Sequence, residues 1–399
     1  MRKQTIVWLC AVLALAVLGG AASAKEIKPV KAKNVIFYVA DGMGPNTLGL
    51  LLNYARLAPG SIYKDRASNA EKFMQEASLG VMFTRTAGTI VTDSAASATQ
   101  FASGAYTLPD RIGVDSNGNA TVTVLEKAKK QGKSTGFVTT SYIQDATPAA
   151  FAAHQISRKN YTEISADIIK TGPDIVLGGG KDFFPQDLIE EASAKGYNFA
   201  FNKSELAPLH GKIIGLFGGL ATPYVIERNT TQPNLTEMAQ KALSELEKNK
   251  KGFFLMIEAG KIDWAAHDND AGALLHELLE FDETLAYLVS YVKKNKDTLL
   301  IVLADHETGG FGFNYREAAE QDNPQAVFNG NYYVSFDALD KIYKQEAVDS
   351  QDGVVWASGN HISTPVYVMA YFGGRQTGYG GVYDTADLAK KVMISLSLK

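Results

Sequence analysis

The feature that most constrains the fold of this chain is a set of short apolar runs that no charged residue interrupts. They span residues 34–40, 253–257 and 298–304, and the last of them, Thr-Leu-Leu-Ile-Val-Leu-Ala, is the strongest strand signal in the sequence. A strand with one face in water alternates apolar and polar residues, whereas a strand covered on both faces does not. These runs therefore predict a sheet that is buried on both sides.

Segments with helical periodicity separate the strand signals. Residues 235–249 have one apolar face, and a longer stripe from Leu274 to Val292 repeats at the spacing of three and four that marks a helix. Further predicted elements are helices at 121–131 and 336–346 and strands at 134–140, 174–177, 213–217 and 365–372. Alternating strands and helices predict an α/β protein whose large central, mainly parallel sheet is flanked by helices on both faces.

Residues 1–24 are predicted to be a secretory signal peptide rather than part of the fold. A basic start and an apolar core at 6–18 precede Ala22-Ser23-Ala24, which has the small residues of a cleavage site. Residues 25–399 then form a single domain, with an insert at about 311–358, where the sequence is more polar and holds no long buried run. A cleaved leader predicts a periplasmic or secreted protein without a membrane anchor.

Composition narrows the classes of partner. The chain carries 39 basic and 43 acidic side chains, and loss of the basic residues of the leader makes the balance more acidic still. This charge argues against nucleic acid or an anionic membrane as the main partner. The one cysteine, Cys10, leaves with the leader, so we expect the core and any bound metals, rather than disulfides, to hold the mature chain.

Potential metal ligands follow the predicted strands. They are Asp41, the loop with Asp145 and Thr147, Glu258, and the pair Asp305 and His306. The carboxyl ends of parallel strands meet at one edge of a sheet, where sites of α/β proteins form. Each residue alone is more simply a turn or cap residue, but their convergence predicts a metal centre. Asp263 and His267, four apart on one helix face, and His361 are further candidates.

Residues 92–99, Thr-Asp-Ser-Ala-Ala-Ser-Ala-Thr, predict a helix that begins at Ser94. Ala is the strongest helix former, and Asp, Ser and Thr are common at helix starts. Free N–H groups and the helix dipole attract anions to such an N-terminus. The Ser94 hydroxyl is therefore a candidate nucleophile, although on this stretch alone an ordinary capped helix is the simpler interpretation.

Together these residues resemble the alkaline phosphatases, metal-dependent phosphomonoesterases with a serine nucleophile. The matching segments occur in the family's order and span nearly the whole mature chain, and Thr-Asp-Ser-Ala-Ala is the most specific of them. They are 41–44, 91–99, 144–148, His154 with 157–158, 258–267, 304–306 and His361. The resemblance implies the sandwich fold of the family with a short crown-like insert, and hydrolysis of phosphate monoesters through a phosphoserine on Ser94.

The resemblance also implies two Zn²⁺ ions and one Mg²⁺ ion. The implied ligands of one zinc are Asp263, His267 and His361. Those of the other zinc are Asp41, Asp305 and His306, and Ser94 completes this second set in the free enzyme. Those of magnesium are Asp41, Thr147 and Glu258. Asp145 would reach the magnesium only through water. Nitrogen and carboxylate ligands suit zinc, and oxygen ligands suit magnesium.

Arg158 is implied to grip two phosphate oxygens with its planar guanidinium, which Asp93 would orient. Trp264 stands where relatives carry Lys, His or Trp. Because its ring has no charge, we hypothesise that inorganic phosphate inhibits this chain less than relatives with Lys. An unchanged inhibition constant in Trp264→Lys would contradict this, and packing of the pocket wall is the plainer interpretation. His154, His210 and His276 are interpreted as structural or surface residues.

Two other classes of function stay open at this point. The first is a phosphodiesterase or sulfatase of the same superfamily, although Arg158 favours a dianionic monoester and the context of Ser94 lacks the sulfatase motif. The second is a secreted metal- or phosphate-binding protein without catalysis, which would have lost a nucleophile or a ligand, and none is missing. Expected partners are small phosphate monoesters and, by analogy, a second copy in a homodimer, with no nucleic acid and no membrane once the leader is removed.

Overall fold

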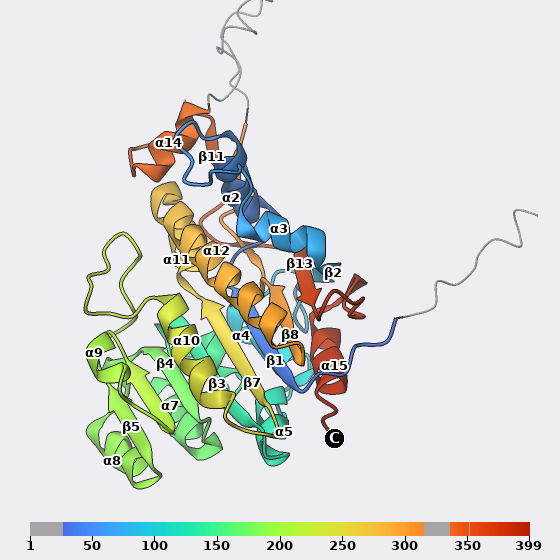
Figure 1. Cartoon of the computed structure of the whole chain (residues 1–399), viewed down its shortest axis with the longest axis vertical. Helices are drawn as coiled ribbons and strands as arrows, with labels where there is room; N and C mark the ends of the chain where they lie inside the picture. Colours follow the sequence, from blue (N-terminus) through green and yellow to red (C-terminus); the bar gives the residue numbers. More distant parts are fainter. Residues whose placement is uncertain (1–26, 315–335, 351) are drawn as a thin grey trace, which may run out of the picture.

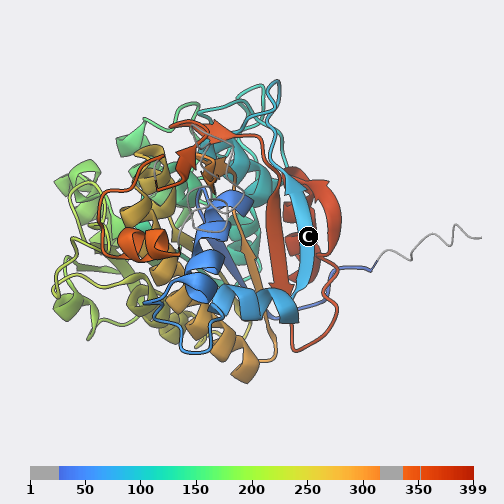
Figure 2. The ribbon, with the colours of Figure 1, turned by 90° about the horizontal axis from the view of Figure 1, so that it is seen from above.

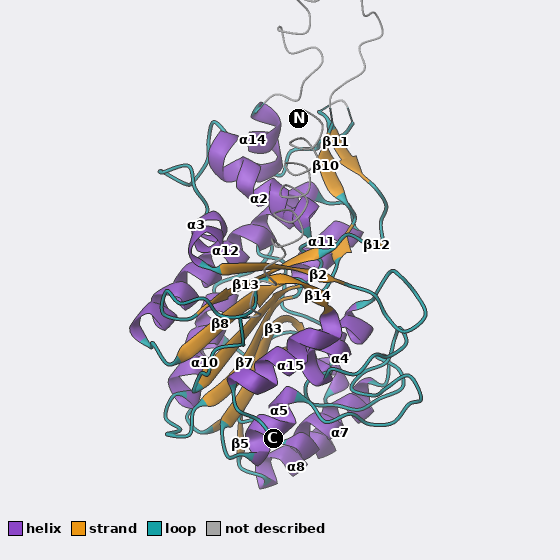
Figure 3. Ribbon diagram, turned by 90° about the vertical axis from the view of Figure 1, so that its right-hand side faces the viewer, coloured by secondary structure: helices purple, strands orange, loops and turns teal. Residues whose placement is uncertain are grey.

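The computed structural model describes residues 27–314, 336–350 and 352–399, so the predicted leader and part of the predicted insert lie outside the described residues. A twisted ten-stranded sheet runs through the molecule between two layers of helices (Figures 1 and 3). In order across the sheet, the strands are β14 (Gly381–Asp384), β2 (Ser78–Phe83), β13 (Val366–Tyr371), β8 (Thr298–Leu303), β1 (Asn34–Ala40), β7 (Phe253–Ala259), β3 (Ser134–Tyr142), β4 (Ile175–Gly179), β6 (Lys212–Leu216) and β5 (Tyr197–Ala200).

The sheet is mainly parallel, as predicted. Only β13 runs antiparallel to its neighbours among the strands of this sheet, pairing with β2 on one side and β8 on the other. Every residue of β7 and β8 is buried, which is why their sequences show no alternation. In the register of the central strands, Val39 of β1 lies opposite Leu303 of β8 and Glu258 of β7. The carboxyl ends of these strands are therefore level with one another.

Helices cover both faces of the sheet. Helices α3, α10 and α12 pack on one face, and α4, α5, α6 and α15 pack on the other, while α2 lies at the end of the sheet against α12 (Figure 3). The described helices are α2 (Pro45–Leu57), α3 (Asn69–Glu76), α4 (Ser94–Ser103), α5 (Val124–Lys130), α6 (Ala146–Ala149), α7 (Tyr161–Thr171), the 3₁₀ turn η1 (Lys181–Phe183), α8 (Gln186–Ala194), α9 (Lys203–Leu206), α10 (Leu235–Leu246), α11 (Lys261–His267), α12 (Ala271–Lys294), α14 (Asp337–Tyr343) and α15 (Thr385–Ser395).

The predicted apolar stripe of the long helix, α12, faces the sheet. Phe281 is fully buried there and stacks on Tyr38 of β1, with 5.0 Å between ring centroids. The Tyr38 hydroxyl donates to the Phe281 carbonyl at 3.1 Å, so the one polar atom of that ring is satisfied inside the core. Burying one such side chain contributes about 1.5–3 kcal/mol, and the contact fixes α12 over the central strands.

Three strands of the main sheet that sequence reasoning missed, β14, β2 and β5, lie at its two edges or next to one. β2 and β5 are partly buried, β14 has no fully buried residue, and all three lack the long apolar runs of the central strands. β2 and β14 belong to distant parts of the chain and pair in parallel, which Figure 2 shows as pale blue β2 beside the red C-terminal segment. A strand at or near an edge is less completely covered, so its sequence carries a weaker signal.

Two small antiparallel sheets lie outside the main sheet. One pairs β9 (Glu307–Thr308) with β12 (His361–Ile362), and the other pairs β10 (Phe311–Phe313) with β11 (Val354–Trp356). The predicted short helix near 336–346 is present as α14, which packs against α2 and α12 (Figure 1). The single-domain division and the bounds of the insert stay predictions. Among the described residues, no helix combines the length and the apolar character that a membrane crossing requires.

Candidate active site

The predicted ligands gather at one edge of the sheet because β8, β1, β7 and β3 are neighbours. Asp41 follows β1, Glu258 lies near the end of β7, and the pair Asp305 and His306 follows β8. After β3, Asp145 caps the start of α6 and Thr147 lies within α6. Helix α11, directly after β7, carries Asp263 and His267. All of these except His267 are buried. The convergence expected from the strand ends is therefore present.

Ser94 is the first residue of α4. Asp93 caps this helix by accepting the N–H of Ala96 at 3.0 Å, and Gly104 ends it in the left-handed conformation. Ala-rich residues between them pack without side-chain clashes, so the helix N-terminus can sit deep in the site. The Ser94 side chain is 3% exposed, and its Oγ lies 3.1 Å from His306 Nε2.

Asp41, Asp305 and His306 place three ligand atoms within 4.8 Å of one another. His306 Nε2 is 3.1 Å from Asp305 Oδ2 and 3.6 Å from Asp41 Oδ1, and among the described residues neither oxygen accepts a hydrogen bond. Buried oxygens without donors cost free energy unless a cation binds them. Burial, and then the charge of Asp305, raises the pKa of Asp41 well above its usual range.

Asp263, His267 and His361 form a second group. His267 Nε2 and His361 Nε2 are 3.0 Å apart, and they lie 3.4 Å and 3.6 Å from the two carboxylate oxygens of Asp263. Each imidazole directs Nδ1 to a backbone carbonyl, His267 to Gly359 at 2.8 Å and His361 to Thr92 at 2.9 Å. A carbonyl only accepts, so Nδ1 carries the hydrogen and the two Nε2 lone pairs face each other. That arrangement fits a cation between them.

Thr308 connects the two groups, and sequence reasoning missed it. Its hydroxyl donates to Asp263 Oδ1 at 2.6 Å and lies 3.1 Å from His306 Nδ1. Because the hydroxyl hydrogen is used on the carboxylate, His306 Nδ1 is the donor and its Nε2 keeps a lone pair for the site. Ser94 is therefore the donor in its contact with His306. Sequence offered no signal for Thr308 beyond its place two residues after a predicted ligand.

A third group consists of oxygen ligands. Thr147 Oγ1 lies 3.5 Å from Asp41 Oδ2, and Glu258 is fully buried nearby. Glu258 Oε2 accepts from Thr139 and from Ser141, the latter at 3.2 Å, while Oε1 has no hydrogen-bond partner among the described residues. Burial, and then the charge of Asp145, raises the pKa of Glu258 to about 8. Oxygen donors with one unsatisfied carboxylate oxygen fit a hard cation such as magnesium.

Arg158 faces the same site. Its Nη2 donates to Asp145 Oδ1 at 3.0 Å, whereas its Nη1 lies 3.8 Å from Asp93 Oδ2. The predicted orienting residue, Asp93, is therefore the more distant of two carboxylates, because it also caps α4 and accepts the N–H of Asp110 at 2.8 Å. Burial would lower the pKa of Arg158, but these two carboxylates raise it above its usual value.

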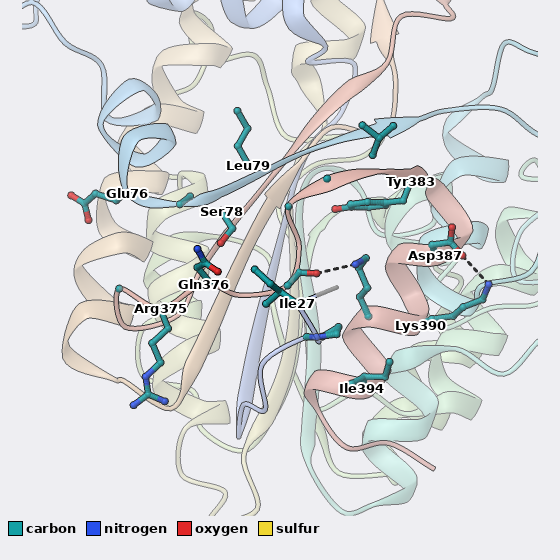
Figure 4. Close-up of a pocket in the computed structure, with 18 residues that line it drawn as sticks. Ile27, Glu76, Ser78, Leu79, Arg375, Gln376, Tyr383, Asp387, Lys390 and Ile394 are labelled. Carbon is teal, nitrogen blue, oxygen red and sulfur yellow. Dashed lines mark hydrogen bonds and ion pairs between the residues drawn. The ribbon is translucent and has the colours of Figure 1, made fainter. Parts of the chain in front are cut away.

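A cavity of about 620 Å³ opens over these residues. It is lined by Val91, Ser94, Tyr142, Asp145, Arg158, Tyr224, Asp263, Trp264, His267, Asp268, Asn360 and His361. A larger cavity of about 1050 Å³ lies between the start of β2, β14 and α15 and shares none of these residues (Figure 4). Its Lys390 and Lys391 already bind Asp387 and the Gly378 carbonyl. The smaller cavity is the candidate active site.

The remaining histidines lie outside this cavity, in agreement with their interpretation as structural or surface residues. His154 contacts the Gly113 carbonyl at 2.7 Å and Glu126 at 3.0 Å. His210 binds Glu245 at 2.9 Å, and His276 contacts the Gly272 carbonyl at 2.9 Å.

Comparison with known proteins places this geometry in a family. A family model described as alkaline phosphatase matches residues 32–398. The chain is 39% identical to Alkaline phosphatase 4 of Bacillus subtilis over 305 residues, 73% of this chain and 64% of that protein, so it spans less than two thirds of the relative's length.

Solved structures agree with the family model. A cold-active alkaline phosphatase from Shewanella sp. is 30% identical, with a TM-score of 0.78, and the match covers 91% of this chain and 99% of that one. A mutant of the alkaline phosphatase of the Antarctic bacterium TAB5 is 28% identical, with a TM-score of 0.77, over 93% of this chain and all of that one. On the match of the family model to nearly the whole described chain, this chain belongs to the alkaline phosphatase family.

Proposed function

We propose that this chain is an alkaline phosphatase, which hydrolyses phosphate monoesters to an alcohol and inorganic phosphate through a phosphoserine on Ser94. The observation that carries the proposal is the placement of the Ser94 hydroxyl at the N-terminus of α4, 3.1 Å from His306 Nε2 and in one cavity with Arg158. A helix N-terminus and a guanidinium both favour a bound phosphoryl group.

We propose two Zn²⁺ ions and one Mg²⁺ ion as cofactors. One zinc would be held by Asp263, His267 and His361, the other by Asp41, Asp305 and His306, and magnesium by Asp41, Thr147 and Glu258. The facing Nε2 lone pairs and the carboxylate oxygens without donors support these assignments. The TAB5 mutant is described with Mg bound in its M3 site, which supports magnesium as the third ion. When bound, such ions neutralise charge on the phosphoryl oxygens and favour the ionised serine and leaving oxygen.

The residues of the chain then have distinct parts in the reaction. Arg158 binds two phosphoryl oxygens, and Asp145 holds the plane of its guanidinium. The Ser94 hydroxyl gives up its proton to solvent, and its oxygen attacks phosphorus in line with the ester oxygen. The bond from phosphorus to the ester oxygen breaks, and that oxygen takes up a proton from solvent and leaves as the alcohol. Water next attacks the phosphoserine, which restores the Ser94 hydroxyl and releases inorganic phosphate. Throughout, the N–H groups at the start of α4 face the negative charge.

The two rival classes make different predictions. A diesterase or sulfatase would turn over a nitrophenyl diester or sulfate faster than the monoester, whereas Arg158 has two donors for a dianionic group. A non-catalytic binding protein would bind phosphate without releasing alcohol from an ester. The intact set of Ser94, Arg158 and metal-type ligands supports catalysis of monoester hydrolysis over both.

We also propose that the mature protein is periplasmic or secreted and forms a homodimer. The leader-like residues 1–24 support the first statement, and analogy with the family that the sequence resembles supports the second. Cell fractionation with sequencing of the mature N-terminus would test the location, and light scattering of the purified protein would test the dimer. Full-length chain retained in the cytoplasm, or a monomer at assay concentration, would contradict the respective statement.

The central experiment is hydrolysis of nitrophenyl phosphate before and after chelation, with Zn²⁺ and Mg²⁺ returned separately and together. We expect chelation to abolish turnover and both ions to be needed for full recovery. Acid-quenched enzyme should carry covalent phosphate, and Ser94→Ala should bind metals normally without forming that adduct. Full activity in a preparation that elemental analysis shows to be free of metal would contradict the proposal, as would a phosphoenzyme in Ser94→Ala.

A further inference from the structure

The active-site cavity is lined both by charged groups and by aromatic rings. Ser94, Asp145 and Arg158 line it together with metal-type ligands, and three rings, those of Tyr142, Tyr224 and Trp264, line the same cavity. We call these three rings the aromatic wall. A volume of about 620 Å³ falls in the range of cavities that hold a drug-sized ligand, far more than a phosphate group needs. Most of the cavity is therefore available to the alcohol part of a substrate.

The aromatic wall is held in place from behind. The Lys261 ammonium lies 3.6 Å from the centroid of Tyr224 and 5.2 Å from that of Trp264, and it donates to the Thr222 carbonyl at 2.9 Å. Lys261 is 4% exposed, so its charge is fixed beneath both rings rather than mobile in solvent. Cation–π contacts of this kind stabilise a ring in one orientation.

Tyr142 is fixed by a second set of rings. Its centroid lies 5.7 Å from that of Tyr161, 5.5 Å from that of Phe183 and 6.2 Å from that of Trp264. Tyr161 and Phe183 stack on each other at 4.2 Å. Rings ordered before a ligand arrives lose little conformational entropy on binding, so more of the stacking energy contributes to affinity.

Trp264 also has a fixed relation to the reacting group. It lies on α11 directly after Asp263 and three residues before His267, both of which line the cavity beside Ser94. Trp264 is part-exposed, and it borders the same cavity as Ser94. An ester whose phosphoryl group meets Ser94 and Arg158 therefore extends its alcohol part into a space that rings border.

We propose that the aromatic wall is a leaving-group subsite for phosphate monoesters whose alcohol carries a flat aromatic ring, such as nucleoside 5′-monophosphates. The ring stacks on the wall while the phosphoryl group meets Ser94 and Arg158. This inference rests on the proposed phosphatase activity and adds to it a preference among substrates. Stacking of a base on aromatic side chains is worth about 1–3 kcal/mol, which corresponds to about 5- to 150-fold in affinity.

The test compares two substrates that release alcohols of the same type. In both adenosine 5′-monophosphate and ribose 5-phosphate the leaving group is the primary alcohol of a ribose. The two substrates therefore differ in the base and not in leaving-group chemistry. We expect the metal-loaded wild-type protein to show kcat/KM at least fivefold higher for the nucleotide. Uridine 5′-monophosphate should likewise exceed its 5,6-dihydro derivative, whose base is not aromatic, because bulk without flatness does not stack.

Variants then assign the preference to the wall. Trp264→Ala and Tyr224→Ala should each bring the ratio of the two kcat/KM values toward one, mainly through the nucleotide. Any disturbance of the neighbouring ligand Asp263 would lower both values together and leave the ratio unchanged. Phe201→Ala, at a ring that is 38% exposed and outside the cavity, is the matched control and should keep the wild-type ratio.

The outcomes separate this inference from the proposed function. Equal kcat/KM for the two substrates in wild type, or a ratio unchanged in both wall variants, would overturn the subsite while leaving the phosphatase intact. Hydrolysis of neither substrate by metal-loaded protein would overturn both. If Trp264→Ala does not fold, Tyr224→Ala and the wild-type ratios decide the question alone.

Discussion

At the scale of single residues, Thr308 is the point where the two zinc-type ligand groups meet. Its hydroxyl binds Asp263 and His306, and its backbone lies opposite His361 in the pairing of β9 with β12. Its N–H also donates to the Gly42 carbonyl, next to Asp41, at 3.2 Å. One buried threonine thus fixes the relative positions of ligands from both groups, and hydrogen bonds of this type orient ligands before a metal binds.

We predict that Thr308→Val weakens zinc binding about 10- to 100-fold, because valine keeps the shape of the side chain but cannot bind Asp263 or hold the His306 tautomer. Thr308→Ser should keep the affinity within a few-fold of wild type. Competition against a chromophoric zinc chelator measures both values without relying on activity. Equal zinc affinity in wild type and Thr308→Val would show that the bridge does not position the ligands.

At the scale of elements, a buried ion pair fixes the connection from β6 to α10 against α12. Arg228 in the connection forms a two-pronged ion pair with Glu280 of α12, and their side chains are 8% and 7% exposed. Glu280 also accepts the N–H of Leu235 at the start of α10, and Glu277 accepts that of Val225 at 2.7 Å. This connection carries Tyr224 into the cavity, so its anchoring shapes the aromatic wall.

We predict that Glu280→Ala lowers the free energy of unfolding by about 3–5 kcal/mol, because it leaves the Arg228 guanidinium buried without a partner. Replacing the whole pair, as in Arg228→Met with Glu280→Leu, should cost much less than the single change. Urea unfolding of the metal-loaded proteins at one pH provides both values. A double variant as unstable as Glu280→Ala would mean that packing or the Leu235 hydrogen bond, and not the unpaired charge, sets the cost.

The sequence predicted those elements whose burial is complete. The runs that became β1, β7 and β8 are apolar at nearly every position because both faces are covered, so they can be recognised from sequence. β14, β2 and β5 lie at or next to the edges of the sheet and are less buried, and their short patterns resemble loops. Helix α2 was not predicted, for a different reason. Its start is bound by Glu307, some 260 positions away in sequence, which accepts the N–H of Asn46 and the hydroxyl of Thr47.

The same reasoning explains which site residues could be predicted. Asp41, Glu258 and Asp305 come at or near the ends of recognisable strands, and the edge of a parallel sheet brings such positions together. Thr139 and Ser141 contact Glu258, and Thr308 contacts Asp263 and His306, through side chains whose direction depends on tertiary structure. Sequence also could not predict that Asp145, rather than Asp93, is the nearer partner of Arg158. That depends on tertiary packing, because the Asp93 carboxylate caps α4.

At the scale of the whole molecule, the fold concentrates buried acids at one end of the sheet. Burial raises the pKa of Glu258 to about 8 and that of Asp41 well above its usual range, in a protein without metal. Two further buried carboxyls are not members of the predicted ligand sets, although one of them, Glu307, directly follows the predicted ligand His306. Burial also raises the pKa of Glu277 to about 8 and that of Glu307 to about 7. Metal binding should reverse the effect for ligands such as Glu258, because a cation favours the ionised form.

This arrangement predicts how metal removal and pH act together on stability. A carboxyl whose pKa is raised on folding stabilises the protein fully below its unfolded pKa, and that contribution is lost as pH rises toward the folded value. His361, whose pKa burial and His306 lower to about 4, has the opposite sign, but its contribution is complete above about 6.5. Glu126 raises the pKa of His154, and Asp305 raises that of His306 against the effect of burial, so both imidazoles change stability in the same direction as the acids between pH 6.5 and 8. Each acid contributes up to about 1.4 kcal/mol per pH unit below its folded pKa.

We expect the free energy of unfolding of the metal-free protein to fall as pH rises from 6.5 to 8, and Glu258→Gln to make that fall shallower. With zinc and magnesium bound, Glu258 is already ionised, so the same variant should not reduce the slope. Glu277→Gln is the matched control, because Glu277 lies outside the proposed ligand sets and its removal should flatten the slope with or without metal. Denaturant unfolding at several pH values measures these slopes. A metal-free protein whose free energy of unfolding is constant or rises over this range would contradict the prediction, because the buried acids would then be ionised without a cation.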